Sequence, residues 1–258
     1  MKYLTKLTPA ETLIVLTGDK TPLSELLKYT FMDLLLKQVL SIKEVQDQAG
    51  ERDPVRIIKY VREGEKFNQH HDRLHESVIL SVFQKTPDVS ILFRNLVKIA
   101  YQNARHKRHY YPQLIENSNL REAFTSNIFE KLFCKFSYTQ RGKQMKTEIE
   151  TEISELEKSI SSVMATDKAR GVELLRSIGG NMFLLKGLEF DIAKEIDHEL
   201  TEEMSKRNSG SGCSSACWVY FDDYSDTFDS SCSSDSSTGC GGDSGCSGCS
   251  GCGGCGGD

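Results

Sequence analysis

The chain lacks a long apolar run, which argues against a membrane-spanning helix. A helix that crosses a bilayer needs roughly 18 apolar residues in succession, whereas the runs LIVL, MDLLL and SVILSVF are short and interrupted. The N-terminal sequence MKYLTKLTPAE also lacks the apolar core and cleavage site of a signal peptide. We therefore expect a cytoplasmic protein without a transmembrane segment, in a compartment that keeps cysteine thiols reduced.

The sequence motifs of several enzyme classes are also missing. We find no P-loop, no G-x-S-x-G nucleophile elbow, no kinase motif set, and no G-x-G-x-x-G placed between a strand and a helix. Paired carboxylates are plentiful, but no pattern places any of them in a cleft. The sequence therefore predicts a non-enzymatic protein and no catalytic residue.

Basic side chains are missing from the last 50 of the 258 residues. Residues 1–208 contain all 32 Lys and Arg and 30 of the 37 Asp and Glu, because the other seven acids belong to residues 209–258. A near-neutral body and an acidic tail give nucleic acid no general electrostatic attraction, so we do not expect nucleic-acid binding. The net charge of −5 arises from the acids of the tail: Asp222, Asp223, Asp226, Asp229, Asp235, Asp243 and Asp258.

The first 66 residues contain helix-start signals followed by two strand-like runs. Thr8-Pro9-Ala10-Glu11 supplies a hydroxyl N-cap, Pro at the first helical position and Glu at the third. Apolar residues in 23–40 follow helical spacing, which predicts two helices broken near Tyr29-Thr30. The runs LSIKEV and VRIIKYV, separated by a polar turn, predict a hairpin. This is the element order of a winged-helix unit, which we assign to residues 1–66.

Residues 67–208 form a second predicted helical unit. Helices are expected over residues 71–84 and 86–103, followed by the basic loop RHKRHYYP. The run LFCKFSYTQRGKQ resembles a strand and wing, so the order of helices and then hairpin occurs twice. Residues 142–163 form the clearest helix, with an apolar seam that we expect to pack on its own domain, and a further helix spans 167–179. The predicted class is mostly α (α+β), with a disordered tail over residues 209–258.

Three features of the chain resemble an uncharacterised bacterial protein family: the opening Leu7-Thr8-Pro9-Ala10-Glu11, the Leu-rich element 34–42, and the Gly/Cys tail from Gly239. Members of that family pair an N-terminal L-x-P-x-E helical domain with a low-complexity tail. Many members look membrane-anchored, whereas this chain has no span. The resemblance implies an architecture and no activity. The helix order also resembles the Golgi-phosphoprotein-type fold, which binds phosphoinositides, without matched binding residues.

The most distinctive stretch is the C-terminal sequence GCGGDSGCSGCSGCGGCGGD, which repeats Cys at every third position near its end. It has no large apolar side chain to bury, so we expect it to stay unfolded by itself and to act through its thiols. Two Cys separated by two residues suit a soft metal ion such as Zn²⁺ or Cu⁺. The candidate metal ligands are Cys240, Cys246, Cys249, Cys252 and Cys255.

Three interpretations of this tail remain open. Uniform Cys spacing without a His or apolar neighbour favours labile metal binding over one defined cluster. Cys and Ser beside Gly are also the residues that peptide-modifying enzymes cyclise to azoles, so the second interpretation makes the tail the substrate of such an enzyme. The third is a solvated segment without a defined ligand. Aromatic residues interrupt the polar tail and are expected to dock it on the body: Trp218, Tyr220, Phe221, Tyr224 and Phe228.

Other candidate residues have structural interpretations that we prefer. His71 and His75 have the i, i+4 spacing of a chelating pair on a helix, but no third ligand is evident, so we expect surface or packed histidines. Cys134 alternates with apolar residues, which favours a buried thiol. Tyr110 and Tyr111 in the basic loop suit phosphate contact with stacking, although an ordinary solvated turn is the preferred interpretation.

The segment TFMDLLLKQVL is the candidate recognition helix of a winged-helix regulator that binds DNA. Its only polar side chains with a donor for contacting DNA bases are Lys37 and Gln38, and Asp33 would repel phosphate. We therefore expect this helix to pack within the protein. Our preferred function is a non-enzymatic interaction protein whose tail presents thiolates to soft metal ions. The alternatives are a substrate of a modifying enzyme and a DNA-binding regulator. The partner is a protein or a modifying enzyme, and the sequence leaves the oligomeric state open.

Overall fold

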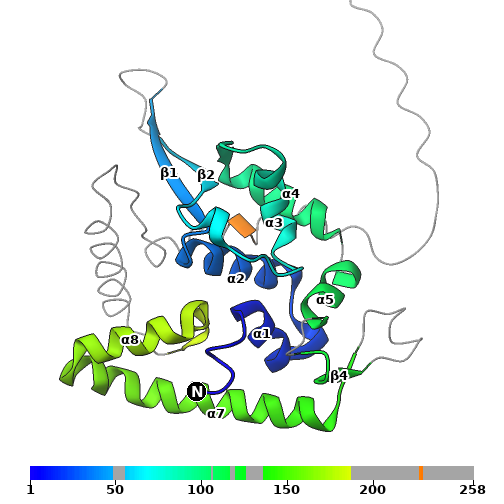
Figure 1. The fold of residues 1–258 in the computed structure, drawn as a ribbon, viewed down its shortest axis with the longest axis vertical. Helices are drawn as coiled ribbons and strands as arrows, with labels where there is room; N and C mark the ends of the chain where they lie inside the picture. The colour runs from blue at the N-terminus through cyan, green and yellow to red at the C-terminus, as the bar shows by residue number, and fades with distance from the viewer. Residues whose placement is uncertain (49–55, 106, 117–119, 126–135, 187–226, 229–258) are drawn as a thin grey trace, which may run out of the picture.

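The chain folds into a mostly helical body with two small antiparallel sheets (Figure 1). This confirms the predicted mostly α (α+β) class. None of the described helices is both long enough and apolar enough to cross a membrane. Except for two of its residues, the tail at 209–258 lies outside the described part of the chain. The computed structural model describes residues 1–48, 56–105, 107–116, 120–125, 136–186 and 227–228.

Helix α1 (Pro9–Thr17) begins where its sequence predicts. Thr8 Oγ1 accepts a hydrogen bond from the Glu11 amide (3.3 Å), and a Glu11 carboxylate oxygen accepts one from the Thr8 amide (2.8 Å). The two bonds form a capping box, which satisfies backbone donors that a helix start leaves without intrahelical partners. The 3₁₀ turn η1 (Gly18–Lys20) follows, and Gly18 adopts a positive φ of 68°.

Helix α2 (Leu23–Leu36) is continuous, so the predicted break near Tyr29-Thr30 is wrong. The helix accommodates Thr30 because its hydroxyl donates to the Leu26 carbonyl (2.8 Å). The same hydroxyl lies 2.9 Å from the Tyr110 hydroxyl. Residues 30–35 are all buried, so the candidate recognition helix packs inside the protein, as expected.

Strands β1 (Leu40–Asp47) and β2 (Arg56–Glu63) form the predicted hairpin, which projects from the helical body in Figure 1. Their register places Glu44 opposite Lys59 and Val45 opposite Ile58, pairs of matching chemistry that stabilise this alignment. The short strand β3 (Ile91–Leu92) extends the sheet beside β2. The order of helices and then hairpin is present, and the winged-helix likeness itself stays a prediction.

Three helices follow the hairpin, and all three differ from the sequence prediction. The helix expected over 86–103 begins only at Phe93, because residues 91–92 form a strand that pairs with β2. After the 3₁₀ turn η2 (Phe67–Gln69), helix α3 begins only at Ser77 instead of residue 71, because residues 70–76 form an extended segment and a turn. The sequence RHKRHYYP is not a loop, because from Lys107 it belongs to a helix that contains Pro112. The bounds are α3 (Ser77–Lys85), α4 (Phe93–Ala104) and α5 (Lys107–Ile115).

The run predicted as a second strand and wing, residues 132–144, is described only from residue 136, where it gives a two-residue strand and then the start of a long helix instead of a wing. Strands β4 (Phe124–Thr125) and β5 (Ser137–Tyr138) pair over two residues, and helix α7 (Gln140–Thr166) begins directly afterwards. The Thr139 hydroxyl caps α7 by accepting from the Gly142 amide (3.0 Å). A Cβ atom at Gly142 would overlap the Ala123 carbonyl, so only glycine lets α7 approach this closely.

Helices α7 and α8 (Lys168–Ile178) run side by side along one edge of the body (Figure 1). Asp167 caps α8 as predicted, since its carboxylate accepts from the Arg170 amide (3.0 Å), and Gly179 ends the helix with a φ of 53°. The α7 seam packs on its own body, which confirms that expectation; its buried members include Ile149, Leu156 and Ile160.

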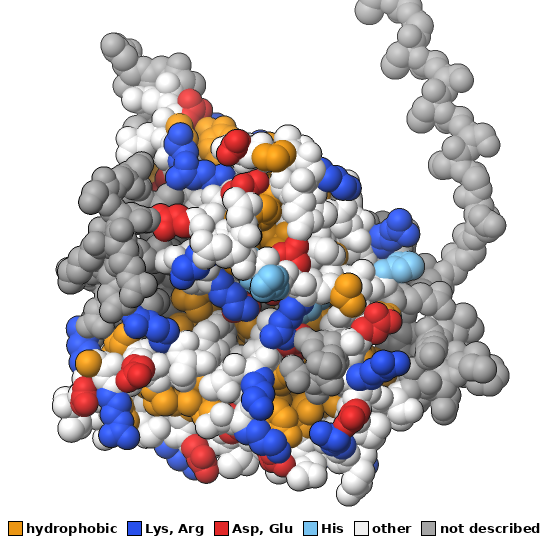
Figure 2. Space-filling model, viewed as in Figure 1, with side chains coloured by type: hydrophobic (Ala, Val, Ile, Leu, Met, Phe, Trp, Pro, Cys, Tyr) orange, Lys and Arg blue, Asp and Glu red, His pale blue; other side chains and the backbone are white. Residues whose placement is uncertain are grey.

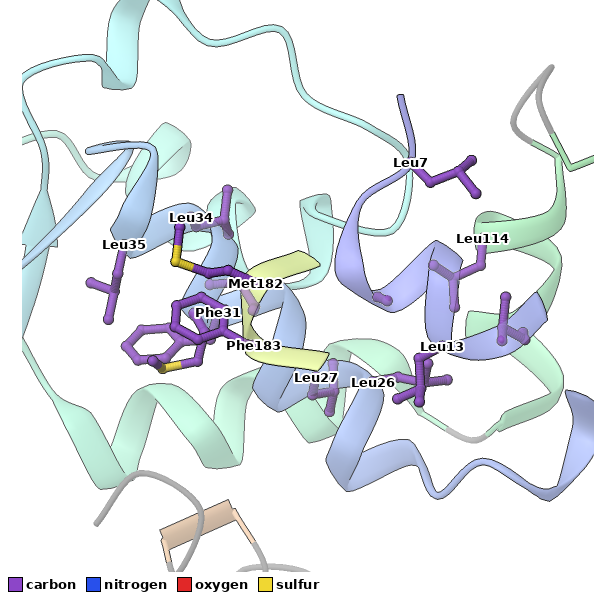
Figure 3. Close-up of a cluster of buried hydrophobic side chains, with 14 of the residues drawn as sticks. Leu7, Leu13, Leu26, Leu27, Phe31, Leu34, Leu35, Leu114, Met182 and Phe183 are labelled. Atoms are coloured by element: carbon purple, nitrogen blue, oxygen red, sulfur yellow. The ribbon is translucent and has the colours of Figure 1, made fainter. Parts of the chain in front are cut away.

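Buried apolar side chains from α1 through the last 3₁₀ turn, η3 (Gly179–Leu184), form one contiguous core. Figure 3 shows Met182 and Phe183 of η3 close to Phe31 and Leu34 of α2. The core draws on residues before and after position 66, and the proposed division into two units stays a prediction.

Candidate functional site

Ionisable side chains lie buried between the start of α1, the last turn of α2 and the turn before α3. We name this group the polar centre. Burying a charge without a partner is costly, so the partners of each group decide what it does. Arg73 is partly exposed and the other members are buried; the polar centre comprises Glu11, Asp33, Arg73, His75 and Glu76.

Glu11 and Arg73 connect α1 to the turn before α3. The Glu11 carboxylate is fully buried and forms an ion pair with the Arg73 guanidinium, in addition to its bond to the Thr8 amide. Arg73 also donates to the Lys6 carbonyl (3.0 Å). The guanidinium therefore closes the N-terminal segment onto residues far along the chain, and the capping glutamate is its counterion.

Glu76 organises the turn itself. One of its carboxylate oxygens accepts hydrogen bonds from the Arg73 amide (2.9 Å) and from His70 Nε2 (2.8 Å). Burial alone would raise the pKa of Glu76, but the hydrogen bond from His70 and the one from the Arg73 amide hold it below its usual value. These contacts explain why α3 begins only after Glu76, since they fix residues 70–76 in a non-helical path.

His75 is 1% exposed and lies inside the polar centre. Its Nε2 is 3.4 Å from the Thr8 hydroxyl, and its ring meets the Tyr110 ring edge to face at 6.4 Å. Nδ1 has no hydrogen-bond partner within the described residues. Burial lowers the pKa of His75, against the opposing charges of Glu11 and Glu76, so the imidazole is neutral at pH 7.

The structure places the two histidines of the i, i+4 pair in different environments. His71 is exposed and precedes the helix, so it does not share a helix face with the buried His75. In the described ranges no three His, Cys, Asp or Glu residues are placed to hold a metal ion. The expectation of packed or surface histidines is confirmed for both residues.

Asp33 completes the polar centre from α2. Its carboxylate accepts from the Lys37 ammonium at 2.5 Å, one helical turn away. Burial raises the pKa of Asp33, and the Lys37 charge opposes that rise. Of the two candidate DNA-contacting residues, Lys37 pairs with a buried acid, and Gln38 lies past the end of α2 with a left-handed backbone (φ 61°), so it does not continue the helix.

The tyrosines of the basic segment are also structural. Tyr110 and Tyr111 are buried in α5, so neither is exposed for stacking on a base, and the solvated turn that we preferred is wrong as well. Tyr110 bonds to Thr30, and the Tyr111 hydroxyl donates to the Thr21 carbonyl. Burial raises the pKa of Tyr110 above its usual value.

A second group of residues binds a piece of the tail. Phe228 is 1% exposed, with its ring centroid 6.0 Å from those of both Phe31 and Phe93. The Tyr101 hydroxyl donates to the Phe228 carbonyl (3.3 Å). We name Phe31, Phe93 and Tyr101 the aromatic socket. It joins α2 and α4 around the segment drawn in orange in Figure 1.

This contact confirms the predicted docking of the tail for Phe228, whereas the other four tail aromatics lie outside the described residues. The signal in the sequence was an aromatic residue in a polar segment. Sequence reasoning missed the socket residues and the Glu11–Arg73 pair, since their partners are distant in the chain. Cys134 and the five candidate metal ligands, Cys240 to Cys255, also lie outside the described residues.

Charge around these sites is mixed. Figure 2 shows acidic and basic side chains interspersed over the described part of one face, as a near-neutral body predicts. Helix α4 departs from this mixture, because it carries Arg94 and Lys98 and no acidic residue.

Comparison with known proteins gives no match: no protein-family model, no curated protein and no solved structure matches this chain. The resemblances inferred from the sequence therefore stay predictions.

Proposed function

We propose that this chain is a non-enzymatic interaction protein, in which a helical body carries a cysteine-rich tail that presents thiolates to soft metal ions. The burial of Phe228 is the observation that supports it most directly. Phe228 belongs to the acidic tail yet fills the aromatic socket of the body, so the five candidate metal ligands all follow an anchored residue in the sequence. Cys240 follows this anchor by twelve positions in the sequence.

The chemistry of the two parts supports a division of roles. The three buried acids of the polar centre all have partners: Glu11 pairs with Arg73, Glu76 accepts from the Arg73 amide, and Asp33 pairs with Lys37, which is how a fold satisfies buried charge. The tail contains eight of the nine cysteines, and its other side chains offer metal ions only oxygen ligands of Ser, Thr, Tyr and Asp. Thiolate is the ligand that Zn²⁺ and Cu⁺ prefer among these groups.

Metal uptake by the reduced full-length chain tests this function. We compare the native sequence with a variant in which Cys240, Cys246, Cys249, Cys252 and Cys255 are all replaced by Ser. Both are loaded with Zn²⁺ or Cu⁺ and desalted, and the bound metal is measured by mass spectrometry. The native chain is expected to retain more metal, while the control Cys134→Ser, which leaves the tail intact, retains as much as the native chain. Equal retention by the native chain and the five-Ser variant would disprove the metal role.

The alternative of a modified tail has a distinct signature. Conversion of Cys or Ser to an azoline removes one water for each ring, so the protein purified from its native host would be lighter than its sequence requires. A native mass equal to the sequence mass removes this alternative. The DNA-binding alternative is not favoured, because residues 30–35 of the candidate recognition helix are buried.

A further inference from the structure

The aromatic socket holds one residue from a distant part of the chain and contacts it in two ways. The Phe228 ring packs against Phe31 of α2 and Phe93 of α4. The Tyr101 hydroxyl binds the Phe228 backbone carbonyl, a group that every residue has. A buried aromatic anchor together with a backbone hydrogen bond is how folded domains bind short peptides.

The charge beside the socket suits the sequence around Phe228. Arg94, Lys98 and Tyr101 have i, i+4, i+7 spacing, so the two exposed bases lie on the same stripe of α4 as the tyrosine that contacts the Phe228 carbonyl. Within the described residues neither base forms an ion pair. Asp226 and Asp229 flank the anchor in the sequence, and the tail has no base to repel this stripe.

We propose that the aromatic socket and the basic stripe of α4 form a peptide-binding site for short acidic segments that contain a phenylalanine. The chain's own Phe228 is the ligand that occupies this site in the structure. An acidic peptide supplied by another molecule competes with it. This inference does not depend on metal binding by the cysteines, because neither the socket nor the anchor contains a thiol.

Direct binding of a labelled peptide tests the site. The probe is a fluorescein-labelled synthetic peptide with the sequence of residues 222–231, DDYSDTFDSS, which contains no cysteine. It is titrated by fluorescence anisotropy against the full-length Phe228→Ala variant, whose socket is vacated, and against the native chain. The variant is expected to bind the peptide at least about tenfold more tightly, because the native tail occupies the socket.

Matched controls separate specific recognition of the peptide from non-specific binding. A peptide with Phe228→Ala should bind about tenfold to a hundredfold more weakly, the range that corresponds to burying one phenylalanine ring. Adding Tyr101→Phe to the Phe228→Ala variant should weaken binding about fivefold by removing one hydrogen bond. A peptide with Asn in place of Asp226 and Asp229 should bind more weakly than the unmodified peptide at low salt, and the two peptides should bind equally at high salt, because salt screens the charges.

Two results overturn the proposal. One is equal binding of the Phe and Ala peptides to the folded Phe228→Ala variant, and the other is no binding of either. If Phe228→Ala loses its helical circular dichroism, the native chain provides the decisive measurement. At peptide concentrations high enough to displace its own anchor, it must bind the Phe peptide in preference to the Ala peptide, and failure to do so refutes the site.

Discussion

Replacing Arg73 with Met removes the counterion of a carboxylate that has no access to water. Met keeps most of the length of the arginine stem, so the change is mainly one of charge and hydrogen bonding. Glu11 keeps its bond to the Thr8 amide, but loses the guanidinium. We expect Arg73→Met to destabilise the fold because a buried carboxylate loses its ion-pair partner.

The magnitude follows from the exposure of the two partners. Removing one member of a fully buried pair costs about 3–5 kcal/mol. The Glu11 side chain is 0% exposed and the Arg73 side chain is 31% exposed, so water screens this pair in part. We therefore expect a loss of about 2–3 kcal/mol in the free energy of unfolding.

Urea unfolding of the full-length chain, followed by circular dichroism, measures this loss. Arg141→Met is the matched control, because Arg141 pairs with Glu122 on the surface with side chains that are 67% and 62% exposed. Such pairs contribute little, so the control should change stability by less than about 0.5 kcal/mol. A double-mutant cycle with Glu11→Gln, which keeps a capping-box residue, should give a coupling of about 1–2 kcal/mol. The reasoning fails if Arg73→Met is no more harmful than Arg141→Met, or if the cycle shows no coupling.

Three other substitutions give independent tests by the same unfolding assay. Because the pKa of His75 in the folded state is below its usual 6.5, the unfolded state binds the proton first, and the free energy of unfolding falls as the pH drops below about 6.5. His75→Gln should make the free energy of unfolding less dependent on pH in this range, and an unchanged slope against pH would contradict the prediction. Phe228→Ala should lower the free energy of unfolding by about 1.5–3 kcal/mol, whereas Leu74→Ala, a change at an exposed residue, should lower it by less than about 0.5 kcal/mol. Equal losses for the two variants would show that Phe228 is not buried in the aromatic socket. Gly142→Ala should cost about 1–3 kcal/mol and lower the melting temperature, because its Cβ meets the Ala123 carbonyl; an unchanged melting temperature would argue against this close approach.

Sequence signals predicted the elements whose ends are decided locally. Thr8 and Asp167 cap helices with their own side chains, and the bonds that do so span only three residues. The hairpin of β1 and β2 could also be predicted from the sequence, since two neighbouring runs of strand-forming residues pair with each other without a distant partner. These features required no knowledge of what lies across the fold.

The errors arise where a distant partner overrides the local pattern. Apolar periodicity continued upstream to residue 71, but Glu76 binds His70 and the Arg73 amide, so α3 starts later. The segment RHKRHYYP has the composition of a polar loop. Tyr110 and Tyr111 are nevertheless buried and form hydrogen bonds with Thr30 and Thr21, and the segment is helical from Lys107. No pattern within either segment contains that information.

The polar centre and the aromatic socket differ in how firmly they tie the chain together. The polar centre joins α1 to the turn before α3 through several bonds, so it opens only when the fold opens. The contacts of the described tail with the body include the Phe228 ring in the aromatic socket and the hydrogen bond from the Tyr101 hydroxyl to the Phe228 carbonyl. Burying a phenylalanine ring contributes about 1.5–3 kcal/mol, and a contribution of that size alone corresponds to a vacant socket in about 0.5–10% of molecules. A competing acidic peptide needs only this minor population to bind, and its apparent affinity is lowered by that fraction. The contribution of the Phe228 ring is thus small enough for a competing peptide to replace it, and the aromatic socket defines which side chain can do so.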